Sequence, residues 1–146
     1  MTPAKPPELM QHAVKALIYR DNGQILLQQR DNQPGLPFPG YWTFFGGRVE
    51  PNETFEIALR RELSEELGCV PGEVGEQLFS WIWRGGDSAE NHVFPVHCLV
   101  NDDVLVLGEG QAMKWVCSDE LKTIRLIPGL LERTSLIEAY IASRSS

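Results

Sequence analysis

The stretch that decides the fold of this chain is Gly47-Arg-Val-Glu-Pro-Asn-Glu53, continued by Arg61-Glu62-Leu63-Ser64-Glu65-Glu66-Leu67-Gly68. Glu62, Glu65 and Glu66 stand at helical spacings, so their carboxylates project from one helix face. Like charges so placed each cost a helix roughly 0.2–0.5 kcal/mol, and the negative end of the helix dipole disfavours carboxylates further. A merely solvated acidic face does not favour this placement. Because hard divalent cations need clustered oxygen ligands, the pattern predicts a metal site.

The residues before these glutamates predict the local structure that carries them. Apolar residues recur every four positions from Phe55 to Leu67, which indicates a helix over residues 54–67 with one apolar face. Thr54 is a favourable N-cap and Gly68 a favourable stop. The pair Gly46-Gly47 is expected to interrupt the preceding strand and to let a backbone carbonyl approach the same cation.

Further out, apolar runs separated by turn residues predict a set of strands and one more helix. Asp21-Asn22-Gly23 is a strong hairpin signal, and the proline-rich segment 31–40 is a loop. Strands are expected at 13–19, 24–29, 41–45, 77–83, 92–100, 104–107 and 114–117, and an amphipathic helix at 130–142. Runs of strands with one central and one terminal helix favour an α+β or mixed α/β sandwich over regular βαβ units.

Composition bounds the class of protein. A chain of 146 residues suits one domain over residues 1–146, with 1–10 as a flexible arm. No apolar stretch approaches the roughly 18 residues of a membrane span, and the first residues do not resemble a secretory signal, so a soluble, cytoplasmic protein is expected. The net charge of −7 argues against a nucleic-acid polymer as partner. The three cysteines contain no close pair. The three histidines show no ligand spacing with one another or with the cysteines, so they are interpreted as structural or surface residues.

The stretch from Gly47 to Cys69 resembles the Nudix box, G-x5-E-x7-R-E-U-x-E-E-x-G-U, where U is a bulky aliphatic residue. The one departure is Cys69 at the last position, where cysteine serves as a small hydrophobe. Asn52 stands where relatives often have glycine, at a position expected to need positive φ. The resemblance implies an α/β/α sandwich with a central mixed sheet.

The resemblance also implies site residues. By analogy the Gly47 carbonyl and three box glutamates bind Mg²⁺, for which Mn²⁺ can substitute, while Glu53 and Arg61 support the loop and helix. Glu109 is implied as a further ligand or as the base. The implied metal ligands are thus Gly47, Glu62, Glu65, Glu66 and Glu109, and the implied catalytic residues are Arg61, Glu62, Glu66 and Glu109.

The implied reaction is hydrolysis of a phosphoanhydride bond in a nucleoside diphosphate linked to another group, such as a nucleoside triphosphate, nucleotide sugar or dinucleotide. The proton acceptor is open among Glu62, Glu66 and Glu109, and Glu109 is preferred because a loop carboxylate moves more freely. Arg30 ends the second predicted strand, where it is either a phosphate contact or a surface arginine. Four aromatic residues are candidates for stacking on a base, although core packing explains each one alone: Phe38, Trp42, Trp81 and Trp83.

Two alternatives remain at this stage. A nucleotide-sensing or protein-binding Nudix domain without catalysis is the first, because a fold does not guarantee an activity. Such domains commonly lose box carboxylates, which this chain keeps. The second is an isomerase of isoprenoid diphosphates, for which no catalytic cysteine in a matching motif is found. A homodimer is also compatible with the sequence.

Overall fold

A computed structural model describes residues 10–83, 88–108, 110 and 112–144, so most of the expected N-terminal arm lies outside it. Its strands form a seven-stranded mixed sheet in which β1 is central: β1 pairs parallel with β6 and antiparallel with β2 and β4. The strands are β1 (Gln11–Tyr19), β2 (Gln24–Gln29), β3 (Trp42–Thr43), β4 (Phe45–Arg48), β5 (Phe79–Trp83), β6 (Ala89–His97) and β7 (Ala112–Cys117).

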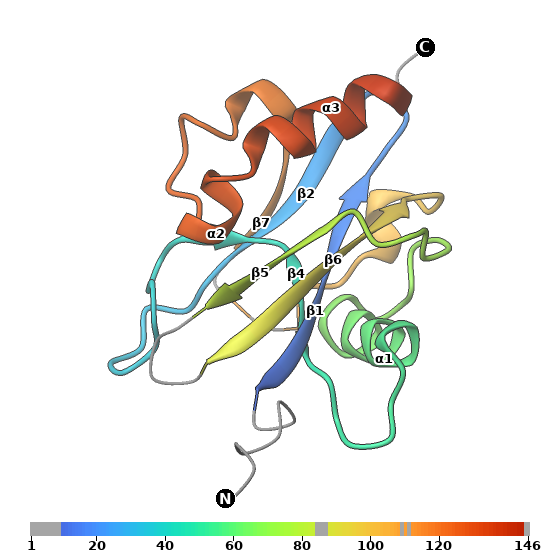
Figure 1. Ribbon diagram of the computed structural model, residues 1–146. Helices are drawn as coiled ribbons and strands as arrows, with labels where there is room; N and C mark the ends of the chain where they lie inside the picture. Colours follow the sequence, from blue (N-terminus) through green and yellow to red (C-terminus); the bar gives the residue numbers. More distant parts are fainter. Residues whose placement is uncertain (1–9, 84–87, 109, 111, 145–146) are drawn as a thin grey trace, which may run out of the picture.

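Helices cover both faces of this sheet (Figure 1). Helix α1 (Phe55–Leu67) packs on one face, against a core that includes Val14, Ala16 and Ile18 of β1. Helices α2 (Pro128–Leu131) and α3 (Thr134–Arg144) cover the other face, where Leu17 and Tyr19 of β1 point. The alternation along β1 therefore separates two cores, and the expected mixed α/β sandwich is confirmed.

The predicted boundaries of the box helix are confirmed. The Thr54 side chain accepts a hydrogen bond from the Ile57 amide at 3.1 Å, and Gly68 ends the helix in the left-handed conformation. Asn52 has a φ of 71°, as its place in the motif predicted.

Other predicted elements differ from the structure. Gly46 and Gly47 do not interrupt a strand, because they pair with Lys15 and Val14 of β1 and so belong to β4. A Cβ on Gly46 would come 2.0 Å from the Val14 carbonyl oxygen, which explains the glycine at this position. Residues 104–107 form no strand and instead follow a short 3-10 helix, η2 (Asp102–Val104). The expected C-terminal helix is split into α2 and α3, and the Thr134 hydroxyl donates to the Leu131 carbonyl at the break.

Strand β6 spans residues 89–97, where 92–100 was predicted, since its register is fixed by nine paired positions along β1. A second 3-10 helix, η3 (Ser118–Glu120), follows β7. None of the helices in the described part of the chain has the length and apolar character that a membrane crossing requires.

Candidate active site

Arg61 connects the loop and the helix of the Nudix box through several hydrogen bonds. Its guanidinium forms a two-pronged bond with the Glu53 carboxylate, with Nε–Oε2 and Nη2–Oε1 distances of 2.7 and 2.9 Å. Nη1 donates to Glu62 Oε1 at 2.9 Å, and Nη2 donates to the Arg48 carbonyl at 3.0 Å. Glu65 Oε1 lies 3.6 Å from Nη1. A planar fork can serve all these acceptors at once, which fixes the helix against the loop before it.

Glu53 completes this connection from the loop side. Its Oε1 also accepts the Glu50 amide at 2.9 Å. The hydrogen bonds from Arg61 and from the Glu50 amide lower the pKa of Glu53 to about 2, and the pKa of Arg61 is raised in return. Both groups therefore stay ionised at every pH at which the protein is expected to work.

The three helix glutamates lie in three different environments. Glu65 is exposed, with 58% of its side chain accessible, whereas Glu62 is mostly covered at 16%. Glu66 is buried, with 4% exposure. The sequence placed them on one face but could not rank their burial, since that depends on β4 and on the loop after η2 packing against the helix end.

Glu66 is held by groups from the sheet. The Gly46 amide donates to its Oε1 at 2.9 Å, and Gln28 Nε2 lies 3.3 Å from its Oε2. Burial raises the pKa of Glu66 to about 7, and the nearby Glu62 charge adds to this effect. A buried carboxylate beside a second carboxylate is costly unless a cation compensates both.

Gly47 brings the backbone against the same carboxylates. A Cβ at this position would lie 2.5 Å from the Glu62 carboxyl carbon, so a larger residue would displace the Glu62 carboxylate. Together the close backbone and the two covered carboxylates form an oxygen-rich donor set of the kind that Mg²⁺ or Mn²⁺ takes. The residues therefore fit a divalent cation. Glu109, the fifth predicted ligand, lies outside the described residues.

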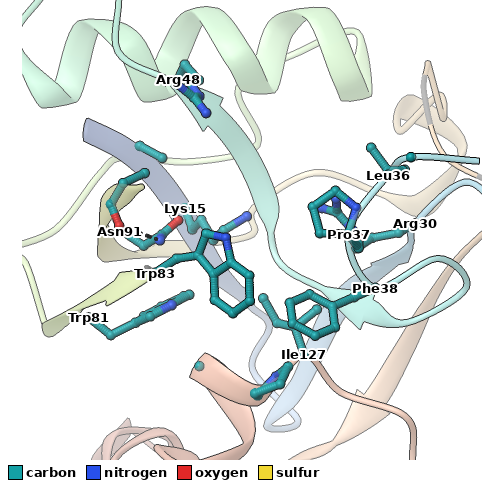
Figure 2. Close-up of a pocket in the computed structure, with 15 residues that line it drawn as sticks. Lys15, Arg30, Leu36, Pro37, Phe38, Arg48, Trp81, Trp83, Asn91 and Ile127 are labelled. Atoms are coloured by element: carbon teal, nitrogen blue, oxygen red, sulfur yellow. Dashed lines mark hydrogen bonds between the residues drawn. The ribbon is translucent and has the colours of Figure 1, made fainter. Parts of the chain in front are cut away.

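The opposite face of the sheet contains a cavity of about 700 Å³, a size typical of small-molecule sites. Figure 2 shows Trp81, Trp83, Phe38 and Asn91 around this cavity. The rings of Phe38 and Trp83 meet edge to face with centroids 5.0 Å apart. Trp81 is seated against Gly129, where a Cβ would lie 2.2 Å from the indole nitrogen.

Basic side chains also line this cavity. Arg30 lines it, and its Nε donates to the Pro37 carbonyl at 2.9 Å. Arg48 and Lys15 are further lining residues (Figure 2). Trp42, in contrast, is not among the lining residues and lies under the Lys114 ammonium, 4.5 Å from its ring centroid.

Lys15 is the residue that sequence reasoning missed. It lines the cavity and pairs with Gly46, whose amide donates to the Glu66 carboxylate. Burial and the Arg30 charge lower the pKa of Lys15 to about 8, while the charges of Glu66 and Glu62 oppose this shift. The sequence signal that could have identified Lys15 is a single charged residue within the apolar run of residues 13–19.

Comparisons with known proteins agree with this geometry. The chain is 37% identical to the CTP pyrophosphohydrolase of Escherichia coli K12, over 94% of this chain and 96% of that protein. It is 33% identical to the nucleoside triphosphatase NudI of Enterobacter sp. strain 638, covering 81% and 90% of the two chains. The solution structure of the E. coli ORF135 protein superposes with a TM-score of 0.69 at 37% identity, covering 92% and 91%. The model of the NUDIX domain matches residues 9–136, and the chain belongs to this family, whose members generally use a divalent metal.

Proposed function

We propose that this protein hydrolyses nucleoside triphosphates to a nucleoside monophosphate and pyrophosphate with the help of Mg²⁺, for which Mn²⁺ can substitute. The observation that carries the proposal is the place of Lys15: it lines the aromatic cavity and pairs with Gly46, whose amide donates to the Glu66 carboxylate at 2.9 Å. An aromatic cavity suits a base, cationic side chains suit phosphates, and carboxylates suit a divalent cation. The names of the two curated relatives point to the same substrate class.

The proposed metal ligands are the Gly47 carbonyl, Glu62, Glu65 and Glu66, with Glu109 as a further one. When bound, the cation neutralises phosphate charge and makes water a better nucleophile. Arg61 holds Glu62 in place through its 2.9 Å hydrogen bond and ties it to Glu53. The proton of the attacking water passes to a carboxylate, for which Glu109 is the preferred candidate and Glu62 and Glu66 the others.

The phosphates are proposed to lie between the box and the cavity. Lys15 and Arg30 supply positive charge there, and Arg30 is positioned by its hydrogen bond to the Pro37 carbonyl. The base is proposed to lie in the aromatic part, against the Trp83 ring. Asn91 is the uncharged polar side chain in the lining, and its amide can both donate to and accept from a base edge.

The experiment is a panel of ribonucleoside and deoxyribonucleoside triphosphates, CTP included, incubated with Mg²⁺ and analysed for products. Release of pyrophosphate with a nucleoside monophosphate is expected, and excess chelator should abolish it. Orthophosphate with a nucleoside diphosphate would contradict the proposed bond. Tight nucleotide binding without any product would favour the sensing alternative, and turnover in excess chelator would contradict the metal dependence.

A further inference from the structure

Two histidines and a glutamate meet at one end of the parallel pair β1 and β6, away from the proposed catalytic carboxylates. His12 is the register partner of Glu90, and His92 follows Glu90 by two residues on the same strand. Residues two apart on a strand share a face, so the three side chains project together. They lie on the α1 face of the sheet, where Phe55 of α1 stacks on His92 at 4.2 Å.

The three side chains present their ligand atoms at chelating distances. His12 Nδ1 lies 3.0 Å from His92 Nε2, and Glu90 Oε1 lies 3.7 and 3.8 Å from these two nitrogens. A cation equidistant from the three atoms would lie about 2 Å from each of them, which is the bond length of Zn²⁺ to imidazole nitrogen and to carboxylate oxygen. The backbone ladder fixes all three positions, so little rearrangement is needed.

The surroundings suit a cation with an open coordination position. The His92 side chain is 8% exposed, whereas His12 and Glu90 are 39% and 32% exposed, so one side of the group faces solvent. The second nitrogen of His92, Nδ1, lies 3.0 Å from Gln77 Nε2, an amide nitrogen that donates to it. Metal binding through Nε2 requires the Gln77 amide to turn over, so that its oxygen accepts the Nδ1 proton, as outer partners do in known metal sites.

The alternative is a purely structural hydrogen bond between the two rings, with Glu90 as a nearby acceptor. Burial lowers the pKa of His92, which favours the neutral ring that both interpretations require. The position of the Glu90 carboxylate distinguishes the two interpretations. A ring-to-ring hydrogen bond does not need Glu90, whereas an acid nearly equidistant from both nitrogens is the third donor that a transition metal uses.

We propose that His12, Glu90 and His92 form a binding site for a divalent transition-metal cation of the Zn²⁺ type, separate from the Mg²⁺ ligands of the box. Imidazole nitrogens select Zn²⁺ and its neighbours over Mg²⁺. A cation at this site would also stabilise the contact between β1 and the Nudix box. The Val49 amide donates to the His12 carbonyl at 2.9 Å, and Phe55, which stacks on His92, is the first residue of α1. Bound Zn²⁺ is therefore expected to raise the Tm of the chain.

The test is Zn²⁺ binding to the full chain by equilibrium dialysis in excess Mg²⁺, which occupies the carboxylate site. Wild-type protein should bind one Zn²⁺ that His12→Gln or Glu90→Gln weakens by at least about tenfold. His97→Gln is the matched control, because His97 pairs with Asp21 at 2.7 Å outside this group. Binding unchanged in both ligand variants, or lost instead in Glu66→Gln, would overturn the site.

A second measurement needs no variant. The chain has three histidines, so its imidazole NMR signals can be followed individually during a Zn²⁺ titration. Signals of His12 and His92 should shift together while that of His97 stays in place. Equal shifts of all three, or a shift of His97 alone, would mean surface binding and contradict the proposal.

Discussion

The two faces of the sheet are built in opposite ways. On the α1 face, a contiguous stretch supplies charges that neutralise one another through Arg61, and the helix glutamates range from exposed to buried. On the other face, the cavity is mostly aromatic and its walls come from distant parts of the chain, such as Phe38, Trp83 and Gly129. The difference suggests a division of labour in which the first face performs the reaction and the second selects the substrate.

The largest effect is expected from Glu65→Gln, which tests whether the charged face carries the chemistry. Turnover with Mg²⁺ should fall by about 10²-fold or more, because a ligand of the cation is lost. In chelator the variant should be as stable as wild type or more stable, by at most about 1 kcal/mol, since repulsion near the helix end is relieved.

Glu56→Gln is the matched control for that change. Glu56 belongs to the same helix, is 57% exposed against 58% for Glu65, and also pairs with an arginine four residues away. Its replacement should leave turnover unchanged. Loss of stability in Glu65→Gln with activity retained would identify the glutamates as a structural acidic face.

The next effect concerns the buried member of the charged face. The pKa of Glu66 is about 7 against an ordinary 4.5, so between these values the folded state keeps a proton that the unfolded state has lost. The free energy of unfolding in chelator should therefore decline as pH rises from about 4.5 to 7, by up to about 3 kcal/mol. Glu66→Gln should lack this decline.

Denaturant unfolding of both proteins at pH 4, 6 and 8 in chelator measures this effect. The two should have similar stability at pH 4, and the variant should be the more stable at pH 8. In Glu66→Gln the side-chain amide oxygen can still accept the hydrogen bond that the Gly46 amide now donates to the carboxylate at 2.9 Å, so the fold is kept. If the free energy of unfolding of both proteins changed with pH in the same way, the raised pKa of Glu66 would be contradicted.

A smaller effect is expected from Arg61→Lys, which keeps the charge but loses the planar fork. Lysine cannot bond Glu53 and Glu62 with the same geometry, so turnover should fall by about 10–100-fold, as for the loss of an outer partner of a metal ligand. Arg60→Lys is the control, because Arg60 bonds only Glu56 among the hydrogen bonds described for its side chain. An equal rate and metal affinity in wild type and Arg61→Lys would refute the orienting role.

The contrast between the two faces also explains what the sequence could predict. Spacing, the Thr54 cap and the Gly68 stop are local, so the box helix and its acidic face followed from a short stretch. The cavity depends on which strands become neighbours, and Lys15 and Trp83 share it only because β5 and β1 both flank β6. His12 and His92 likewise lie 80 residues apart in the chain and 3.0 Å apart in the fold, through a parallel pairing that no local pattern reveals.

The smallest effect is expected from Trp83→Ala, which tests whether the aromatic face selects the substrate. Stacking of a base on an aromatic ring contributes about 1–3 kcal/mol. Because the Trp83 ring also packs edge to face with Phe38, we expect a loss at the low end of this range, which corresponds to a rise in KM of about five- to tenfold. The kcat should stay nearly constant, since the ring lines the cavity and is not among the proposed metal ligands. Ile82→Ala is the matched control: Ile82 is the preceding residue of β5, points to the opposite side and is 41% exposed. Steady-state kinetics of both variants measure kcat and KM separately. A fall in kcat with KM unchanged in Trp83→Ala would mean that the cavity takes part in the reaction, and the proposed division of roles between the two faces would then be wrong.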